Sequence, residues 1–143
     1  MDLITKSILN EFVTEHTLER LAEDTAFEHL TAYLVTCQHD TEKFSTTDIV
    51  IGNGGDGSVD SIAIIVNGRV INEPDEITDI EDGFLDVSFV FNQAKRTSAF
   101  DGSVIGDMVY GVTDFFSEKQ KIPLNAEAAQ KAQITREILR QAP

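Results

Sequence analysis

Two apolar segments of this chain each meet polar side chains that could do chemistry. Asp60 opens the segment Asp60–Val66, and Gln93 and Lys95 close the segment Phe84–Lys95. A carboxylate and an amide carbonyl are hard oxygen ligands of the kind that Mg²⁺ takes in proteins. A lysine beside such an ion can orient or deprotonate a water molecule and can stabilise negative charge on a phosphate. These residue types together are the ones that a metal-dependent phosphodiesterase needs.

Both segments are predicted to be β-strands, and alternation decides which side chains share a face. Gln93 and Lys95 continue the face of Val87, Phe89 and Phe91, while Asp60 continues the face of Ile62, Ile64 and Val66. Burying an unpaired ammonium is costly, so a lysine on a core face requires a partner or a function. We expect Asp60, Gln93 and Lys95 to converge at one rim of the core. The alternative is that Lys95 reaches water past the strand end and Asp60 merely starts its strand.

Hydrophobic periodicity and turn residues predict the elements that position these groups. Helices are expected over 2–15, from Thr17 to about Cys37, over 104–116, and from Asn125 to about Arg140. Strands are expected over 49–51, 60–66, from Arg69 to Asn72, and over 84–95, with Asn67 and Gly68 as a two-residue hairpin turn. Residues 73–83 are expected to form an acidic surface loop. This order predicts one α/β domain over 1–143 with a mixed central β-sheet flanked by α-helices.

The expected last helix is only weakly apolar, so we expect it to pack against something absent from this chain. Its basic residues, with those at 95–96 and 119–121, are interpreted first as solvated faces and second as a nucleic-acid surface. The glycine cluster 52–57 literally matches the dinucleotide-binding pattern, but a strand follows where that pattern requires a helix. A repeat-type calcium loop fails because Val59 stands where an aspartate is needed.

The composition limits the partners. Asp and Glu outnumber Lys and Arg by 25 to 11, giving a net charge of −14. Phosphate contacts supply most nucleic-acid affinity, so this chain alone should bind DNA weakly without a metal, a second subunit or further sequence. A lone Cys37, expected to be a buried structural thiol, fits a reducing compartment. With neither a membrane span nor a signal peptide in the pattern, we expect a cytoplasmic protein that does not bind membranes.

Two motifs carry a resemblance to a known family. Gly54–Asp60 followed by Ile62-Ala63, together with Phe91–Lys95, resembles the restriction-endonuclease-like nuclease fold. The likeness is to its Mrr-type branch, in which a glutamine replaces the second acidic residue of the Asp…(Asp/Glu)-x-Lys signature. With Val66–Gly68, Phe100–Gly102 and Ile105–Phe116 added, residues 20–118 resemble the N-terminal domain of abortive-infection phage-resistance (AIPR) proteins.

The resemblance implies a restriction-endonuclease-like core and Mg²⁺- or Mn²⁺-dependent cleavage of nucleic acid, DNA ahead of RNA, in anti-phage defence. Asp60 would be the motif aspartate, Gln93 the second metal-site residue and Lys95 the catalytic lysine, with Glu28 of the first core helix as a further catalytic residue or an exposed helix glutamate. Ser58 and Ser61 depart from the glycines common in related sequences. The chain is also far shorter than those proteins, so we expect it to be an N-terminal piece.

Two other functions stay open at this point. The nuclease fold could have lost activity and serve as a module for homodimerisation or partner binding, which the acidity and the polar last helix favour. A third alternative is a small inhibitor that mimics DNA with an acidic surface. That function would need carboxylates spread over one face and would not need Lys95.

Overall fold

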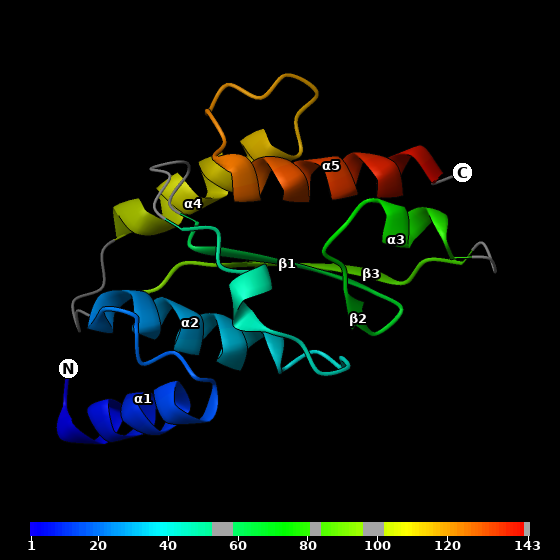
Figure 1. The fold of residues 1–143 in the computed structure, drawn as a ribbon. Helices are drawn as coiled ribbons and strands as arrows, with labels where there is room; N and C mark the ends of the chain where they lie inside the picture. Colours follow the sequence, from blue (N-terminus) through cyan, green and yellow to red (C-terminus); the bar gives the residue numbers. More distant parts are fainter. Residues whose placement is uncertain (53–58, 81–83, 96–101, 142–143) are drawn as a thin grey trace.

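A computed structural model describes residues 1–52, 59–80, 84–95 and 102–141. In this part of the chain the fold is α/β, with a three-stranded antiparallel sheet and five α-helices. Figure 1 shows the sheet as a middle layer, with α1 and α2 on one side and α3, α4 and α5 on the other. No helix among these residues is long and apolar enough to cross a membrane.

The sheet is built around one buried strand. β1 (Ser61–Val66) pairs with β2 (Arg69–Val70) on one edge and with β3 (Val87–Asn92) on the other, antiparallel in both cases. The prediction of a mixed sheet is therefore wrong for the described strands. The predicted hairpin turn is confirmed, because Asn67 and Gly68 adopt φ values of 52° and 81° between β1 and β2. Such positive φ values are why this dipeptide suits the turn.

The expected strand over 49–51 is reduced to a single bridge. Val50 pairs with Ser61 after the short 3₁₀ helix η1 (Thr46–Asp48). Two backbone hydrogen bonds fix it, from the Ile51 N–H to the Asp60 carbonyl at 3.0 Å and from the Ile62 N–H to the Ile49 carbonyl at 2.9 Å. This bridge ties the residues before the glycine cluster to the start of β1. The cluster itself, over 53–58, lies outside the described residues.

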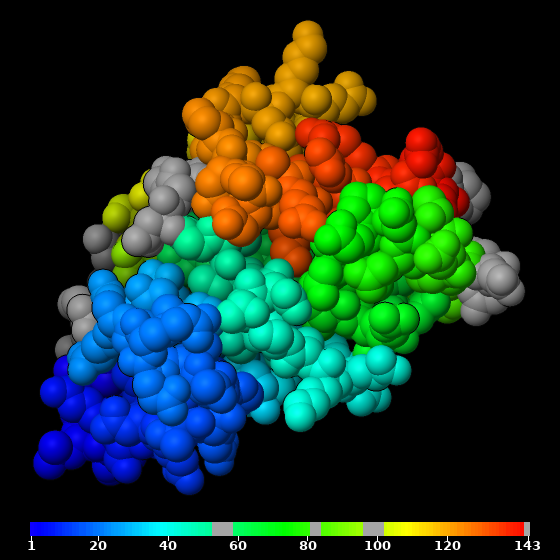
Figure 2. Space-filling view, in the orientation of Figure 1, coloured from blue at the N-terminus to red at the C-terminus, as the bar shows by residue number. Residues whose placement is uncertain are grey.

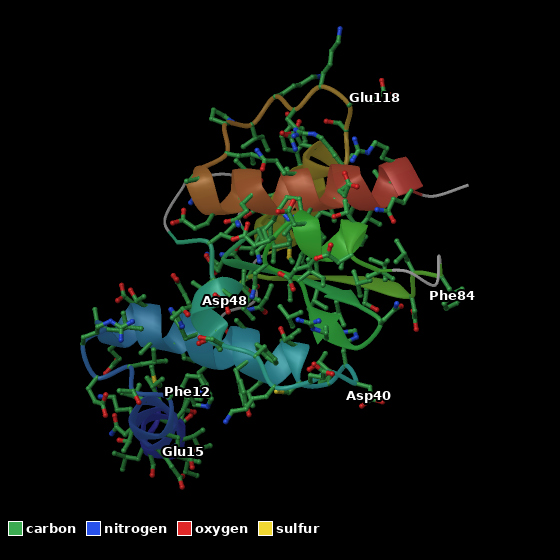
Figure 3. The ribbon with its side chains drawn as sticks, turned by 45° about the vertical axis from the view of Figure 1, so that its right-hand side comes forward. Phe12, Glu15, Asp40, Asp48, Phe84 and Glu118 are labelled. Atoms are coloured by element: carbon green, nitrogen blue, oxygen red, sulfur yellow. The ribbon has the colours of Figure 1, made fainter. Side chains whose placement is uncertain are left out.

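Helices α1 (Leu3–Glu15) and α2 (Glu23–Thr36) form the first helical layer. Asp2 caps α1, because its carboxylate accepts the Thr5 N–H at 2.8 Å. Phe12 lies between the two helices (Figure 3) and packs against Tyr33, with ring centroids 5.4 Å apart. α2 in turn covers the sheet face that carries the buried side chains of Ala63, Ile65 and Val90. Cys37 at its C-terminus is exposed, so the expectation of a buried thiol is wrong.

The opposite face of the sheet carries the larger core. The helices over it are α3 (Asp75–Thr78), α4 (Gly102–Phe115) and α5 (Ala126–Gln141). Its apolar side chains come from alternate sheet positions and from α5, namely Ile62, Ile64, Val66, Val87, Phe89, Phe91, Ala132, Ile134 and Ile138. α5 is thus a core helix of this chain, against the expectation that it needs an absent partner. α3 occupies part of what was expected to be a loop over 73–83.

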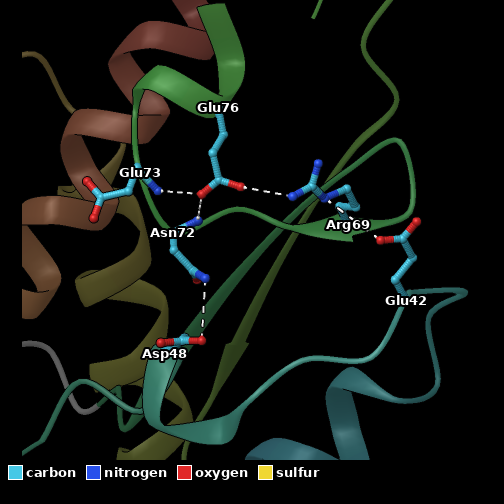
Figure 4. Close-up of polar contacts among 6 residues, drawn as sticks. All are labelled: Glu42, Asp48, Arg69, Asn72, Glu73 and Glu76. Carbon is cyan, nitrogen blue, oxygen red and sulfur yellow. Dashed lines mark hydrogen bonds and ion pairs between the residues drawn. The ribbon is translucent and has the colours of Figure 1, made fainter. Parts of the chain in front are cut away.

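Polar contacts hold α3 and η1 against the β1–β2 hairpin (Figure 4). The Glu76 carboxylate accepts the backbone N–H groups of Asn72 and Glu73, both at 2.9 Å, which closes the first turn of α3. The Asn72 amide nitrogen reaches Asp48 at 3.4 Å, and the Arg69 guanidinium lies 3.6 Å from Glu76. These contacts join η1 to the stretch from β2 to α3 on one side of the sheet.

Lys131 lies in the interior beside this cluster. It is 4% exposed, although it was interpreted as part of a solvated basic face. Burial lowers the pKa of the Lys131 ammonium, and the carboxylates of Asp48, Glu76 and Glu73 oppose that shift. Because the pKa of Lys131 is lowered overall, the folded state disfavours its charged form. Desolvation therefore outweighs the attraction of the three carboxylates.

We expect Lys131→Met to stabilise the chain at neutral pH by about 1 kcal/mol, because methionine fills the space without a desolvated charge. The folded chain holds fewer protons on Lys131 than the unfolded chain, so the penalty falls as the pH rises toward about 10. Urea unfolding of both proteins at several pH values measures the difference, with exposed Lys43→Met as the control. A methionine variant less stable than wild type at pH 7 would contradict the expectation.

Candidate active site at one end of the sheet

The predicted site residues lie at the end of the sheet where α2 begins, at the left of Figure 1. Asp60 directly precedes β1, and Gln93 and Lys95 follow β3, which ends at Asn92 rather than continuing to Lys95. The register brings the two strand ends together, because Ser61 pairs with Asn92. The Asp60 N–H also donates to the Asn92 carbonyl at 2.8 Å. Residues 32 positions apart in sequence therefore meet across one backbone hydrogen bond.

The Asp60 carboxylate is held in place by the segment that follows β3. Its Oδ2 accepts the Ala94 N–H at 2.7 Å. Partial burial raises the pKa of the Asp60 carboxyl, while the Ala94 hydrogen bond and the positive charge of Lys95 lower it by less. A carboxylate in this position is fixed in orientation and still short of compensating charge. Both properties suit a group that binds a cation.

Glu28 comes to the same place from α2. Partial burial raises the pKa of the Glu28 carboxyl, and the negative charges of Asp60 and Asp24 raise it further. The Coulombic effect of Asp60 on Glu28 means that the two carboxylates lie within electrostatic reach of each other. Unlike an exposed helix glutamate, Glu28 is partly buried. Carboxylates whose pKa values are raised by burial and by a neighbouring charge are concentrated at functional sites.

Gln93 and Lys95 have different surroundings. The Gln93 Oε1 atom is buried and has no hydrogen-bond partner among the described residues. A buried amide oxygen without a donor costs free energy, so it is a place where a bound cation or water would be stabilising. Lys95 is exposed, and it acts on Asp60 through its charge rather than through a direct ion pair. Lys95 therefore extends into solvent beside the carboxylate, as the alternative interpretation of the sequence had it.

Alternation along the strands explains only part of this arrangement. Phe89 and Phe91 pack with Ile62 and Ile64 on the face covered by α5, as expected. Glu28, however, belongs to α2, which covers the opposite face. Asp60, Gln93 and Lys95 lie just beyond the paired strands, where the ladder no longer sets the direction of the backbone, and Asp60 is within electrostatic range of both Lys95 and Glu28.

Sequence reasoning missed Asn92, which attaches α2 to this strand end. Asn92 is buried, and its amide nitrogen donates to the Thr31 hydroxyl oxygen at 3.0 Å. Thr31 lies three residues after Glu28, so this bond places the helical turn that carries Glu28. The sequence signal that could have identified Asn92 is that it is a polar residue at the end of an apolar run, on the strand face opposite to Phe91.

We expect Thr31→Val to destabilise the chain by about 1–2 kcal/mol, because the buried Asn92 amide loses its acceptor. Thr113→Val is the matched control, since the Thr113 hydroxyl only donates to the Val109 carbonyl one turn earlier on an exposed helix. Thermal unfolding of both variants measures the difference. Equal stability of Thr31→Val and wild type would show that the Asn92 bond does not hold α2 in place.

The donor atoms fit a hard divalent cation better than zinc. Among the described residues, no three His, Cys, Asp or Glu side chains are grouped so that they could hold a metal ion by themselves. Mg²⁺ is commonly bound through one or two carboxylates and keeps several water ligands. Asp60 supplies a fixed carboxylate, and Gln93 supplies an amide oxygen that lacks a donor. These two residues could hold such an ion with water completing its shell.

No family model matches this chain, and no curated protein or solved structure matches it either. A function for this chain must therefore follow from its own residues and from how the fold places them.

Proposed function

We propose that this chain is a Mg²⁺- or Mn²⁺-dependent nuclease domain that hydrolyses phosphodiester bonds of nucleic acid, with DNA favoured over RNA. The observation that carries the proposal is the Asp60 carboxylate, fixed by the Ala94 N–H between the charges of Glu28 and Lys95. A restriction-endonuclease-like core, membership of the AIPR family and a role in anti-phage defence belong to the same proposal, and the motif resemblance supports them.

The chain's own groups divide the work as follows. Asp60 and Gln93 would hold the divalent ion, which would supply charge stabilisation at the phosphate and lower the pKa of a bound water. Lys95, exposed beside Asp60, orients the attacking water and stabilises the negative charge that develops on the phosphate oxygens. Glu28, whose pKa is raised, accepts a proton from that water at its carboxylate. The exposed position of Lys95 and the partly buried positions of the carboxylates are consistent with these roles.

A cleavage assay tests the proposal directly. Single- and double-stranded DNA and RNA are incubated with the chain in Mg²⁺, Mn²⁺, Ca²⁺ or EDTA, beside Asp60→Ala and Lys95→Ala. We expect cleavage with Mg²⁺ or Mn²⁺ and its loss in both variants. Equal cleavage by all three proteins would assign the activity to a contaminant or another site. No cleavage under any condition, in this chain and in a longer protein that contains it, would contradict catalysis.

One surface favours the second candidate function, an inactive module for homodimerisation. α4 carries a row of exposed apolar side chains, in which Val109 is 60% and Tyr110 57% exposed, with Ile105 and Phe116 beside them. A contiguous apolar patch on a soluble domain commonly marks an association surface. Sedimentation of wild type and Val109→Asp tests it. A dimer that the aspartate dissociates supports this function, and a wild-type monomer at all concentrations contradicts it.

A further inference from the structure

A surface hollow of about 470 Å³ lies between the first half of α2, the segment after η1 and the start of α5. In Figure 2 these three regions, blue, teal and orange, meet on the face that is shown. Its apolar wall is formed by Leu21, Val50 and Ile51. Polar groups on the same wall include the side chains of Thr25 and His29. The volume is within the range of small-molecule sites.

His29 is a buried polar group that lines this α2–α5 hollow. It is 6% exposed, and its Nδ1 is 2.8 Å from the buried Thr46 hydroxyl. The other ring nitrogen has no hydrogen-bond partner among the described residues, and neither has the hydroxyl of Thr25. A ring fixed at one nitrogen and unpaired at the other is ready to recognise a hydrogen-bonding edge. The Asn125 amide, by contrast, is already used by the Ile51 carbonyl and the Ala128 N–H.

The hollow adjoins the candidate active site. Ile51, which lines it, donates its N–H to the Asp60 carbonyl at 3.0 Å. His29 directly follows Glu28 on α2, so one helical turn supplies a side chain to each place. A nucleotide whose phosphate lies at Asp60 would therefore have the hollow within reach of its sugar and base.

The charge of the hollow decides which part of a nucleotide it suits. Arg20 is its one cationic side chain among the described residues, and Glu127, which also lines the hollow, carries the opposite charge. The chain as a whole carries a net charge of −14, which works against holding a free phosphate there. A nucleobase is uncharged, has flat faces for Leu21 and Val50, and has edges that pair with hydroxyl and imidazole groups.

We propose that the α2–α5 hollow binds an unpaired nucleobase of the nucleic acid, read by His29 and Thr25. This inference rests on the proposed function, which supplies nucleic acid as the ligand. It extends that function by naming single-stranded or unpaired nucleic acid as the substrate class. Bases in a stacked duplex present no face to such a hollow, so a base must leave the stack to enter it.

Uncharged nucleosides test the inference without cleavage or metal. Adenosine, cytidine, uridine and thymidine are titrated to about 10 mM, where millimolar affinity is measurable, while NMR follows the His29 ring signals in EDTA. We expect saturable shifts of His29 and Thr25 with at least one nucleoside. No shift, or shifts centred elsewhere, would overturn the inference. Equal shifts with inorganic phosphate would also overturn it, because they would show an anion site.

One substitution at His29 and one at Thr25 test the two polar groups of the hollow separately. His29→Asn keeps a polar atom near the position of Nδ1, and so the contact with Thr46, but removes the unpaired nitrogen. Thr25→Val removes the hydroxyl at equal volume and guards against a folding defect in the first variant. We expect each to weaken nucleoside binding about tenfold, while His39→Gln, an exposed histidine, leaves it unchanged. Wild-type affinity in both His29→Asn and Thr25→Val would overturn the inference.

The failures of the two proposals can be told apart. A chain that cleaves nucleic acid but binds no nucleoside keeps the nuclease function and loses the base-binding hollow. A chain that binds nucleosides at His29 but never cleaves keeps the hollow as a site for unpaired bases. Binding in Asp60→Asn, measured in EDTA, isolates the hollow from the metal site.

Discussion

Asp60→Asn is expected to lower metal-dependent cleavage by about 100-fold or more, because the divalent ion loses its fixed carboxylate. The substitution is nearly isosteric, and the asparagine Oδ1 can still accept the Ala94 N–H that holds Asp60. The fold should therefore persist while the charge is removed. Initial rates at saturating Mg²⁺ measure the effect.

Lys95→Met should cause a loss of similar size, since the exposed ammonium beside Asp60 is proposed to stabilise charge on the phosphate. Asp79→Asn and Lys119→Met are the matched controls, because both residues are exposed and belong to other parts of the fold. Retained activity in Asp60→Asn, or equal losses in the control variants, would exclude the assigned roles.

The second large expected effect is stabilisation by the metal itself. At a free Mg²⁺ concentration of about 100 times Kd, binding to the folded chain alone adds about 2.7 kcal/mol, or roughly 5–10 °C in Tm for a domain of this size. The shift should vanish in Asp60→Asn. Differential scanning calorimetry with Mg²⁺ and with equal ionic strength of Na⁺ separates specific binding from screening. An equal shift with Na⁺ would count against a specific ion.

The raised pKa values of Asp60 and Glu28 predict the sign of the pH dependence without metal. The folded chain holds more protons on these carboxyls than the unfolded chain does, from about pH 4 up to their raised pKa values. Their contribution to stability is therefore present at acidic pH and is lost as the pH rises through those values. Asp60→Asn removes this loss, so it should make the metal-free chain more stable at neutral pH than wild type.

Local signals predicted much of the fold. The Asn67–Gly68 turn followed from two residues that tolerate positive φ, and β1 followed from an unbroken apolar run. The end of β3 could not be predicted, because Gln93 and Lys95 continue the alternation although pairing stops at Asn92. β3 ends where its partner strand β1 begins, and that pairing depends on the tertiary structure rather than on the local sequence.

The burial of α5 in the core is the main feature that the sequence pattern failed to predict, and the reason is physical. The helix reads as polar because Lys131 and Thr135 interrupt its apolar residues, yet both side chains are buried. Lys131 lies within electrostatic range of the carboxylates of Asp48, Glu73 and Glu76. The Thr135 hydroxyl donates to the Lys131 carbonyl at 2.9 Å. A local pattern cannot reveal partners that come from distant segments.

Some residues of the candidate site could be predicted from the local sequence and others could not. Asp60 and Gln93 could be named from strand ends and residue chemistry, whereas Glu28 came only from the motif resemblance. The Asn92–Thr31 bond that positions Glu28 joins residues 61 positions apart, so nothing in either segment alone indicated it. The α2–α5 hollow likewise forms from three segments whose sequences carry no common motif.

Paramagnetic broadening by Mn²⁺ tests the central claim most directly, because it locates a bound ion through its distance from each resonance. In an NMR titration with substoichiometric Mn²⁺, we expect the strongest broadening at Asp60, Gln93 and Ala94, then at Glu28, and its loss in Asp60→Asn. Broadening centred on the other acidic cluster, at Asp48 and Glu76, or spread evenly over the acidic surface, would contradict a metal site at this end of the sheet.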